Sequence, residues 1–88
     1  MDIDNLRIKI NLIDLELLKK LKERMIISKD IGILKKKTNT KILDSDRERQ
    51  LLDSLIGSEI NVFEDGKNEE FITELWNVIM KFSKKNQV

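Results

Sequence analysis

Eight polar side chains in this sequence are of the types that bind and hold an anion. Four are cations, two are carboxylates and two are uncharged hydrogen-bonding groups: Arg7, Arg24, Lys35, Arg47, Asp44, Glu48, Ser83 and Gln87. Guanidinium groups match carboxylates with paired hydrogen bonds. The chain has no cysteine and no histidine, which removes thiolate and imidazole chemistry. These residues therefore predict an anion-binding active site whose reaction runs on carboxylates, cations, hydroxyls and amides.

Helical spacing relates three of the cations to one another. Arg24 and Lys35 are eleven residues apart, about three turns at ~3.6 residues per turn, so they share one helix face with Ser28 and Ile31. Two cations can therefore face one ligand. Arg7 precedes Arg24 by seventeen residues, which places it ~25 Å away along a straight helix and roughly 100° round the axis. If Arg7 serves a site, we expect that site to belong to another chain.

Apolar residues recur every three, four or six positions through the first third of the chain. They are Leu6, Ile10, Ile13, Leu17, Leu21, Met25, Ile31 and Leu34. This pattern predicts one long amphipathic helix that Asp4 or Asn5 caps. Gly32 interrupts it at a cost of about 1 kcal/mol, which would mark a helix end or a close approach of the backbone to a ligand. Because the pattern continues beyond Gly32, we expect the helix to reach about Lys37 and a loop to occupy residues 38–41.

Two shorter helices are expected in the rest of the chain. The second begins at Asp44 or Ser45, where residues 45–48 fit an S-x-x-E capping box, and Gly57 is expected to end it. Its apolar face is Leu51, Leu52, Leu55 and Ile56. After a turn at Asp65-Gly66, the third helix is expected from Glu69 to about Lys84. Its inward residues are Phe71, Ile72, Leu75, Trp76, Ile79 and Phe82.

Composition favours a single all-α domain over residues 1–88. Its 88 residues, 40% hydrophobic and 38% charged, suit one small domain, and domains of this size often need disulfides, a metal or oligomerisation. Without cysteine or histidine, disulfides are excluded and a metal site is not expected. A first helix of about 30 residues would be ~45 Å long, too long for two short helices to cover. We therefore expect a second copy of the chain to pack on it.

The charge balance and the hydropathy of the chain exclude several classes of partner. Lys and Arg total 17 against 16 Asp and Glu, so the formal charge of +1 does not indicate a nucleic-acid binder or an anionic-membrane binder. No apolar run approaches the ~20 residues of a membrane span. The acidic start, residues 1–4, does not have the basic stretch of a signal peptide. A cytoplasmic location is therefore expected.

Each candidate residue also has a simpler interpretation when it is taken alone. The cations of the first helix would be ordinary solvated charges. Asp44 and Glu48 would cap the second helix, and Arg47 would pair with a carboxylate of its own helix. Ser83 and Gln87 would be solvated near a frayed C-terminus. Only the joint pattern of these residues favours an active site.

That joint pattern follows the order of one known family. The segments that carry it are LRIKINLID at 6–14, LL at 17–18, ERM at 23–25, IG at 31–32, Lys35, DSDRER at 44–49 and LL at 51–52. Ser83 and Gln87 then stand where that family has a serine and a glutamine on its last helix. Over nearly its whole length, the chain resembles the all-helical chorismate mutase family, the AroQ type.

The resemblance implies a fold and a reaction. The fold is an intertwined homodimer of three-helix chains in which the long first helices pack along each other. Each of the two sites would take Arg7 from the opposite subunit. The reaction is the Claisen rearrangement of chorismate to prephenate in phenylalanine and tyrosine biosynthesis. It is unimolecular and needs no cofactor, metal, nucleophile or proton shuttle.

The resemblance also implies a role for each site residue. Arg24 and the partner subunit's Arg7 would clamp the two substrate carboxylates, while Lys35 would touch the ether oxygen and a carboxylate. Gln87 would donate to the ether oxygen from the other side. Two further pairs would complete the site: Glu48 with the backbone near Asp44 at the substrate hydroxyl, and Arg47 with Ser83 at the carboxylates.

Three other functions fit parts of the sequence. A relative on the same fold eliminates pyruvate from isochorismate with much the same cations. A non-catalytic helical dimer would serve as a regulatory or docking module. The chain could also dock to another enzyme of the pathway if it is itself an enzyme. A helical anion or nucleic-acid binder would use the lysines of residues 35–41, but the near-zero net charge disfavours it.

Overall fold

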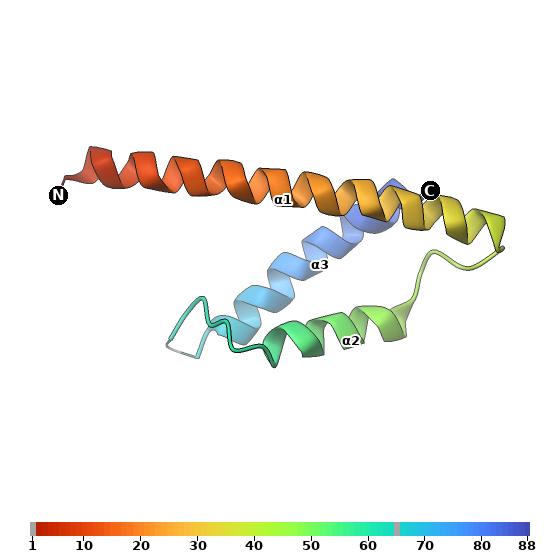
Figure 1. The fold of residues 1–88 in the computed structure, drawn as a ribbon. Coiled ribbons are helices and arrows are strands. Elements are labelled where there is room, and N and C mark those ends of the chain that lie inside the picture. Colours follow the sequence, from red (N-terminus) through yellow and green to blue (C-terminus); the bar gives the residue numbers. More distant parts are fainter. Residues whose placement is uncertain (1, 65) are drawn as a thin grey trace.

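A computed structural model describes residues 2–64 and 66–88, which form three helices and no strand. In chain order these are α1 (Ile3–Lys37), α2 (Ser45–Ile56) and α3 (Asn68–Gln87). Figure 1 shows that α3 begins beside α2 and ends beside the C-terminal half of α1. Within the described part of the chain, α3 packs against both other helices, whereas the backbones of α1 and α2 do not come close to each other. The predicted all-α class is confirmed.

Helix α1 dominates the shape of the molecule. It contains 35 residues, and the long axis of the chain measures 55 Å. The N-cap is Asp2, whose carboxylate accepts the Asn5 backbone N–H at 2.8 Å. The predicted caps, Asp4 and Asn5, are therefore wrong, because Asp2 has the extended backbone of an N-cap and Asp4 lies within the first turn. The C-terminal end at Lys37 is confirmed.

The apolar face of α1 has little cover in a single chain. Only Ser28 and Gly32 are buried among the residues of this helix. The apolar residues of its N-terminal half, Leu6, Ile10, Ile13 and Leu17 among them, are exposed. Figure 1 shows this half extending past the other two helices. None of the helices in the described ranges is both long enough and apolar enough to cross a bilayer.

Helix α2 begins with a different cap from the predicted box. Asp44 is the N-cap, and its carboxylate accepts the Arg47 backbone N–H at 3.0 Å. Ser45 is the first residue of the helix, so the capping box in which Ser45 is the cap is wrong. The carboxylate of Glu48 is therefore not used for capping. Gly57 ends the helix as predicted, and the four predicted apolar residues of α2 are half-buried.

Helix α3 starts one residue before and ends three residues after the predicted range, so both Ser83 and Gln87 are helical. Gly66 precedes it with φ of +84°, and Asp65, the other residue of the predicted turn, lies outside the described residues. Ile72 and Ile79 are buried as predicted, and Trp76 is half-buried.

Three predicted core positions of α3 are wrong in the single chain. Phe71, Leu75 and Phe82 are exposed, with Phe82 50% accessible. The two phenylalanines lie roughly 80–100° round the helix axis from Ile72, at the margin of the buried face. Met80, on the other side of that face, is buried instead.

Gly32 lies where the backbones of α1 and α3 meet. A Cβ atom on Gly32 would lie 2.6 Å from both the Cα and the carbonyl oxygen of Gln87. The glycine therefore neither ends the helix nor admits a ligand. It admits the last turn of α3, which is also held by a hydrogen bond from the Asn86 side chain to the Met25 carbonyl oxygen.

Replacing Gly32 with alanine is expected to lower the stability of the protein. Helix propensity favours alanine by about 1 kcal/mol, but the added methyl group meets backbone atoms that cannot rotate aside, and overpacking costs about 1–3 kcal/mol or more. Urea denaturation at fixed protein concentration measures the balance. Asp30→Ala is the control, because Asp30 is exposed on the same helix. A Gly32→Ala protein as stable as the Asp30→Ala protein would show that α3 does not approach this closely.

Candidate active site

A cavity of about 410 Å³ lies between the C-terminal half of α1, the start of α2 with the loop before it, and the end of α3. Seven of the eight predicted site residues line it: Arg24, Lys35, Asp44, Arg47, Glu48, Ser83 and Gln87. A volume in the range of about 300–1,000 Å³ is typical of sites for small molecules. The three helices thus bring residues together that lie up to 63 positions apart in the sequence.

Arg7 does not line this cavity. It lies near the N-terminal end of α1, about 25 Å from Arg24 along the axis of the helix. Arg7 is also exposed in the single chain. Its own chain therefore does not bring it to the other seven residues, in agreement with the helical spacing in the sequence.

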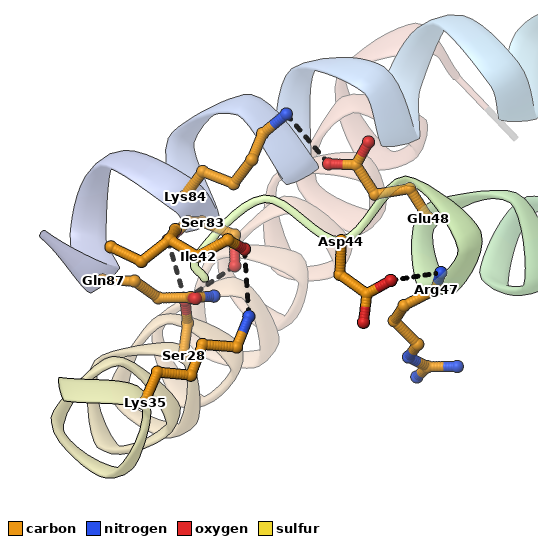
Figure 2. Close-up of polar contacts among 9 residues, drawn as sticks. All are labelled: Ser28, Lys35, Ile42, Asp44, Arg47, Glu48, Ser83, Lys84 and Gln87. Atoms are coloured by element: carbon orange, nitrogen blue, oxygen red, sulfur yellow. Dashed lines mark hydrogen bonds and ion pairs between the residues drawn. The ribbon is translucent and has the colours of Figure 1, made fainter. Parts of the chain in front are cut away.

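The loop before α2 holds the amine of Lys35 at the wall of the cavity. Lys35 Nζ donates a hydrogen bond of 3.0 Å to the Ile42 carbonyl oxygen (Figure 2). An ammonium group has three N–H donors. Lys35 therefore keeps donors for a ligand while one of them fixes its position.

Ser28 connects α1 to the C-terminal end of α3 through hydrogen bonds. It is 3% exposed, and its Oγ donates to the Ser83 carbonyl oxygen at 2.9 Å. The two serine hydroxyls lie 2.6 Å apart, and either can donate to the other. Gln87 Nε2 donates to the same Ser28 Oγ at 3.3 Å. Ser28 therefore positions both polar residues that α3 was predicted to supply.

This arrangement leaves hydrogen-bonding capacity on the Gln87 amide. Its Oε1 atom is buried and has no hydrogen-bond partner among the described residues. A primary amide has two N–H donors, and Ser28 accepts only one of them. The second N–H of Gln87 is therefore available to an acceptor, and Figure 2 shows the Gln87 amide and the Lys35 amine on the same side of the site.

An ion pair crosses from α2 to α3 at the other side of the cavity. Lys84 Nζ lies 2.9 Å from Glu48 Oε1 (Figure 2). Lys84 lines the cavity together with Met80, Ser83 and Gln87, which follow one face of α3. Lys84 was not among the predicted site residues, although its spacing of three residues from Gln87 places it on the same helix face. Ser28 was placed on the correct face, but its partners were not predicted.

The charges and the apolar walls of the cavity define what it can hold. Four cations and two carboxylates line it, a net charge of +2, and the cations are Arg24, Lys35, Arg47 and Lys84. The apolar lining residues are Ile27, Ile31, Ile42, Leu51 and Met80. This combination suits a small dianion with an apolar ring. Among the described residues, no three carboxylates gather closely enough to hold a metal ion.

The available groups limit the chemistry of the site. Neither Arg24 nor Arg47 has an ion-pair partner in the part of the chain described here, so both guanidinium groups are free to bind carboxylates. The simpler interpretation of Arg47, an ion pair on its own helix, is therefore wrong. Amines, guanidinium groups and an amide can position an anion and stabilise charge on an oxygen atom.

Comparison with known families identifies one match over most of the sequence. The family model of chorismate mutase type II matches residues 6–88, a range that includes all eight predicted site residues. No curated protein matches the chain.

Replacing Ser28 with alanine is expected to destabilise the protein by about 1–3 kcal/mol, because the buried Ser83 hydroxyl and the Gln87 amide lose their partner. Urea denaturation at fixed protein concentration measures this loss. Ser54→Ala is the matched control, since Ser54 is an exposed helical serine of α2. Equal stability of the two variants would mean that the Ser28 hydrogen bonds do not hold α3.

Proposed function

The chain belongs to the chorismate mutase type II family, and we propose that it rearranges chorismate to prephenate, the step that leads toward phenylalanine and tyrosine. One observation carries the proposal. Seven of the eight residues that the family resemblance selects, drawn from three helices and the loop before α2, meet around one cavity of net charge +2. Chorismate is a dianion with a ring, so its charge and shape match that cavity.

The rearrangement does not require the protein to form a covalent bond with the substrate. One C–O bond breaks as one C–C bond forms within the same molecule, and no atom or electron leaves or enters. Catalysis then consists of holding the reactive conformer and stabilising negative charge on the ether oxygen. Lys35 and Gln87 both retain N–H donors. We assign these donors to the ether oxygen.

The cations and hydroxyls take the remaining polar groups of the substrate. Arg24 and Arg47 have no ion-pair partner among the described residues and are assigned to the carboxylates. Ser83 lines the cavity together with them and is assigned to the same carboxylates. The Asp44 carboxylate accepts the Arg47 N–H, so the substrate hydroxyl is left to Glu48 and the backbone near Asp44.

The same proposal includes a homodimer. The N-terminal half of α1 presents exposed isoleucine and leucine side chains, and Arg7 lies on this half, away from its own cavity. Packing two such helices along each other would cover the apolar face. It would also bring Arg7 of each chain to the cavity of the other, where it would join Arg24 at the carboxylates. A dimer of this kind, free of any cofactor and acting in the cytoplasm, completes the proposed function.

The first prediction is turnover of chorismate by the purified protein at neutral pH, followed by the loss of the diene absorbance with prephenate as product. Lys35→Ala is expected to lower kcat about 10²–10³-fold, the usual effect of removing one donor to a developing oxyanion. Lys36→Ala is the control, because Lys36 is the next residue, is exposed and does not line the cavity. A folded protein that leaves chorismate unchanged would refute the proposal. Elimination of pyruvate from isochorismate would then identify the protein as the related lyase.

The second prediction tests the shared site. Arg7→Ala and Lys35→Ala chains are each expected to be nearly inactive. After subunit exchange between equal amounts, roughly a quarter of the wild-type activity should return, because half of the dimers are mixed and each mixed dimer has one complete site. No recovery in a mixture shown to contain mixed dimers would mean that Arg7 does not act across the interface.

A further inference from the structure

The ion pair between Lys84 and Glu48 joins α3 to α2 at the cavity. The backbones of α1 and α2 do not come close to each other within the described residues, so α3 is the helix against which α2 packs at the cavity. The pair lies on the wall of the cavity, with the Lys84 and Glu48 side chains 36% and 28% exposed. The pairs Lys19–Glu16 and Lys20–Glu23, in contrast, lie within α1 and are far more exposed. Ion pairs of that exposed kind contribute little to stability.

Glu48 poses an electrostatic problem for a site that binds a dianion. A carboxylate in the cavity wall repels the carboxylates of the substrate unless a cation compensates it. With Lys84 the cavity has a net charge of +2, and without it the net charge would be +1. The proposed role of Glu48, accepting a hydrogen bond from a substrate hydroxyl, also requires a fixed carboxylate.

The other cations of the cavity are not paired with Glu48. The Lys35 amine donates to the Ile42 carbonyl oxygen. Arg47 precedes Glu48 on α2 and so points about 100° away round the helix. No ion pair joins Arg24 to Glu48 among the described residues. Lys84 is therefore the cation that contacts the Glu48 carboxylate.

We propose that Lys84 is a positioning residue that holds the Glu48 carboxylate toward the substrate hydroxyl and neutralises its charge beside the substrate dianion. This inference rests on the proposed function. Lys84 acts through Glu48 and does not itself bind the substrate. One oxygen of Glu48 serves Lys84, and the other is left for the hydroxyl.

Replacing Lys84 with methionine tests the charge while it keeps the length of the side chain. We expect KM for chorismate to rise roughly tenfold, within the range of coupling between contacting residues, and kcat to stay within about twofold, because substrate and transition state carry the same charge. Lys84→Arg should restore KM, and Lys84→Gln should repeat the methionine result if the methionine variant fails to fold. Lys85→Met is the control, since Lys85 is exposed and its amine lies over the Phe82 ring, 5.0 Å from the centroid.

A double-mutant cycle separates positioning from direct binding. In a Glu48→Gln background, Lys84→Met should change KM less than about twofold, because no carboxylate remains to be held. A loss in that background as large as in the wild type would show that Lys84 binds the substrate directly, and the proposal would be overturned. An unchanged KM in the single Lys84→Met variant would overturn it as well.

A measurement without substrate keeps this proposal distinct from the proposed function. The NMR signal of the Glu48 carboxyl carbon in the ligand-free protein should move on Lys84→Met and stay in place on Lys85→Met. If the wild type does not turn over chorismate and this signal moves, the proposed function fails and the positioning of Glu48 by Lys84 stands. A signal that does not move on Lys84→Met overturns the positioning role whatever the turnover.

Discussion

The contact between the last turn of α3 and the C-terminal half of α1 is the constraint on which the cavity depends. Gly32 permits it, since any larger residue would meet the backbone of Gln87, and the Ser28 hydroxyl fixes its register through Ser83 and Gln87. Because α2 packs only on α3 among the described helices, its charged residues reach the cavity through the same contact. A shift of α3 would therefore move two walls of the cavity at once.

The small core is one reason why we propose that a second chain stabilises the fold. Among the described residues, the buried hydrophobic ones are Ile72, Ile79 and Met80, and the sequence contains no cysteine for a disulfide. So small a core rarely stabilises a domain of this size. A second chain on the exposed face of α1 would bury much more apolar surface. The helix half that needs this cover is also the half that carries Arg7, so folding and completion of the proposed site would depend on one interface.

The sequence predicted relations within a helix better than relations between helices. Helical spacing placed Arg24 and Lys35 on one face and separated Arg7 from both, because helical geometry alone determines these relations. The end of α1 at Lys37 was predicted from how far the apolar pattern continues. The family pattern supplied the residues on α2 and α3. The partners of Ser28 and the ion pair of Lys84 depend on how the helices pack, which no local spacing encodes. Phe82 was assigned to the core for the same reason, since hydrophobicity does not fix how wide the buried face of α3 is.

The most direct test of the account measures chorismate turnover per chain and molecular mass together as the protein is diluted. A site completed by Arg7 of the partner subunit exists only in the dimer. We predict full activity at twice the chain mass of 10.4 kDa and activity that falls in proportion to the dimer when the chains separate. Undiminished turnover by a species of 10.4 kDa would contradict the shared site, and a stable dimer without turnover would contradict the proposed reaction.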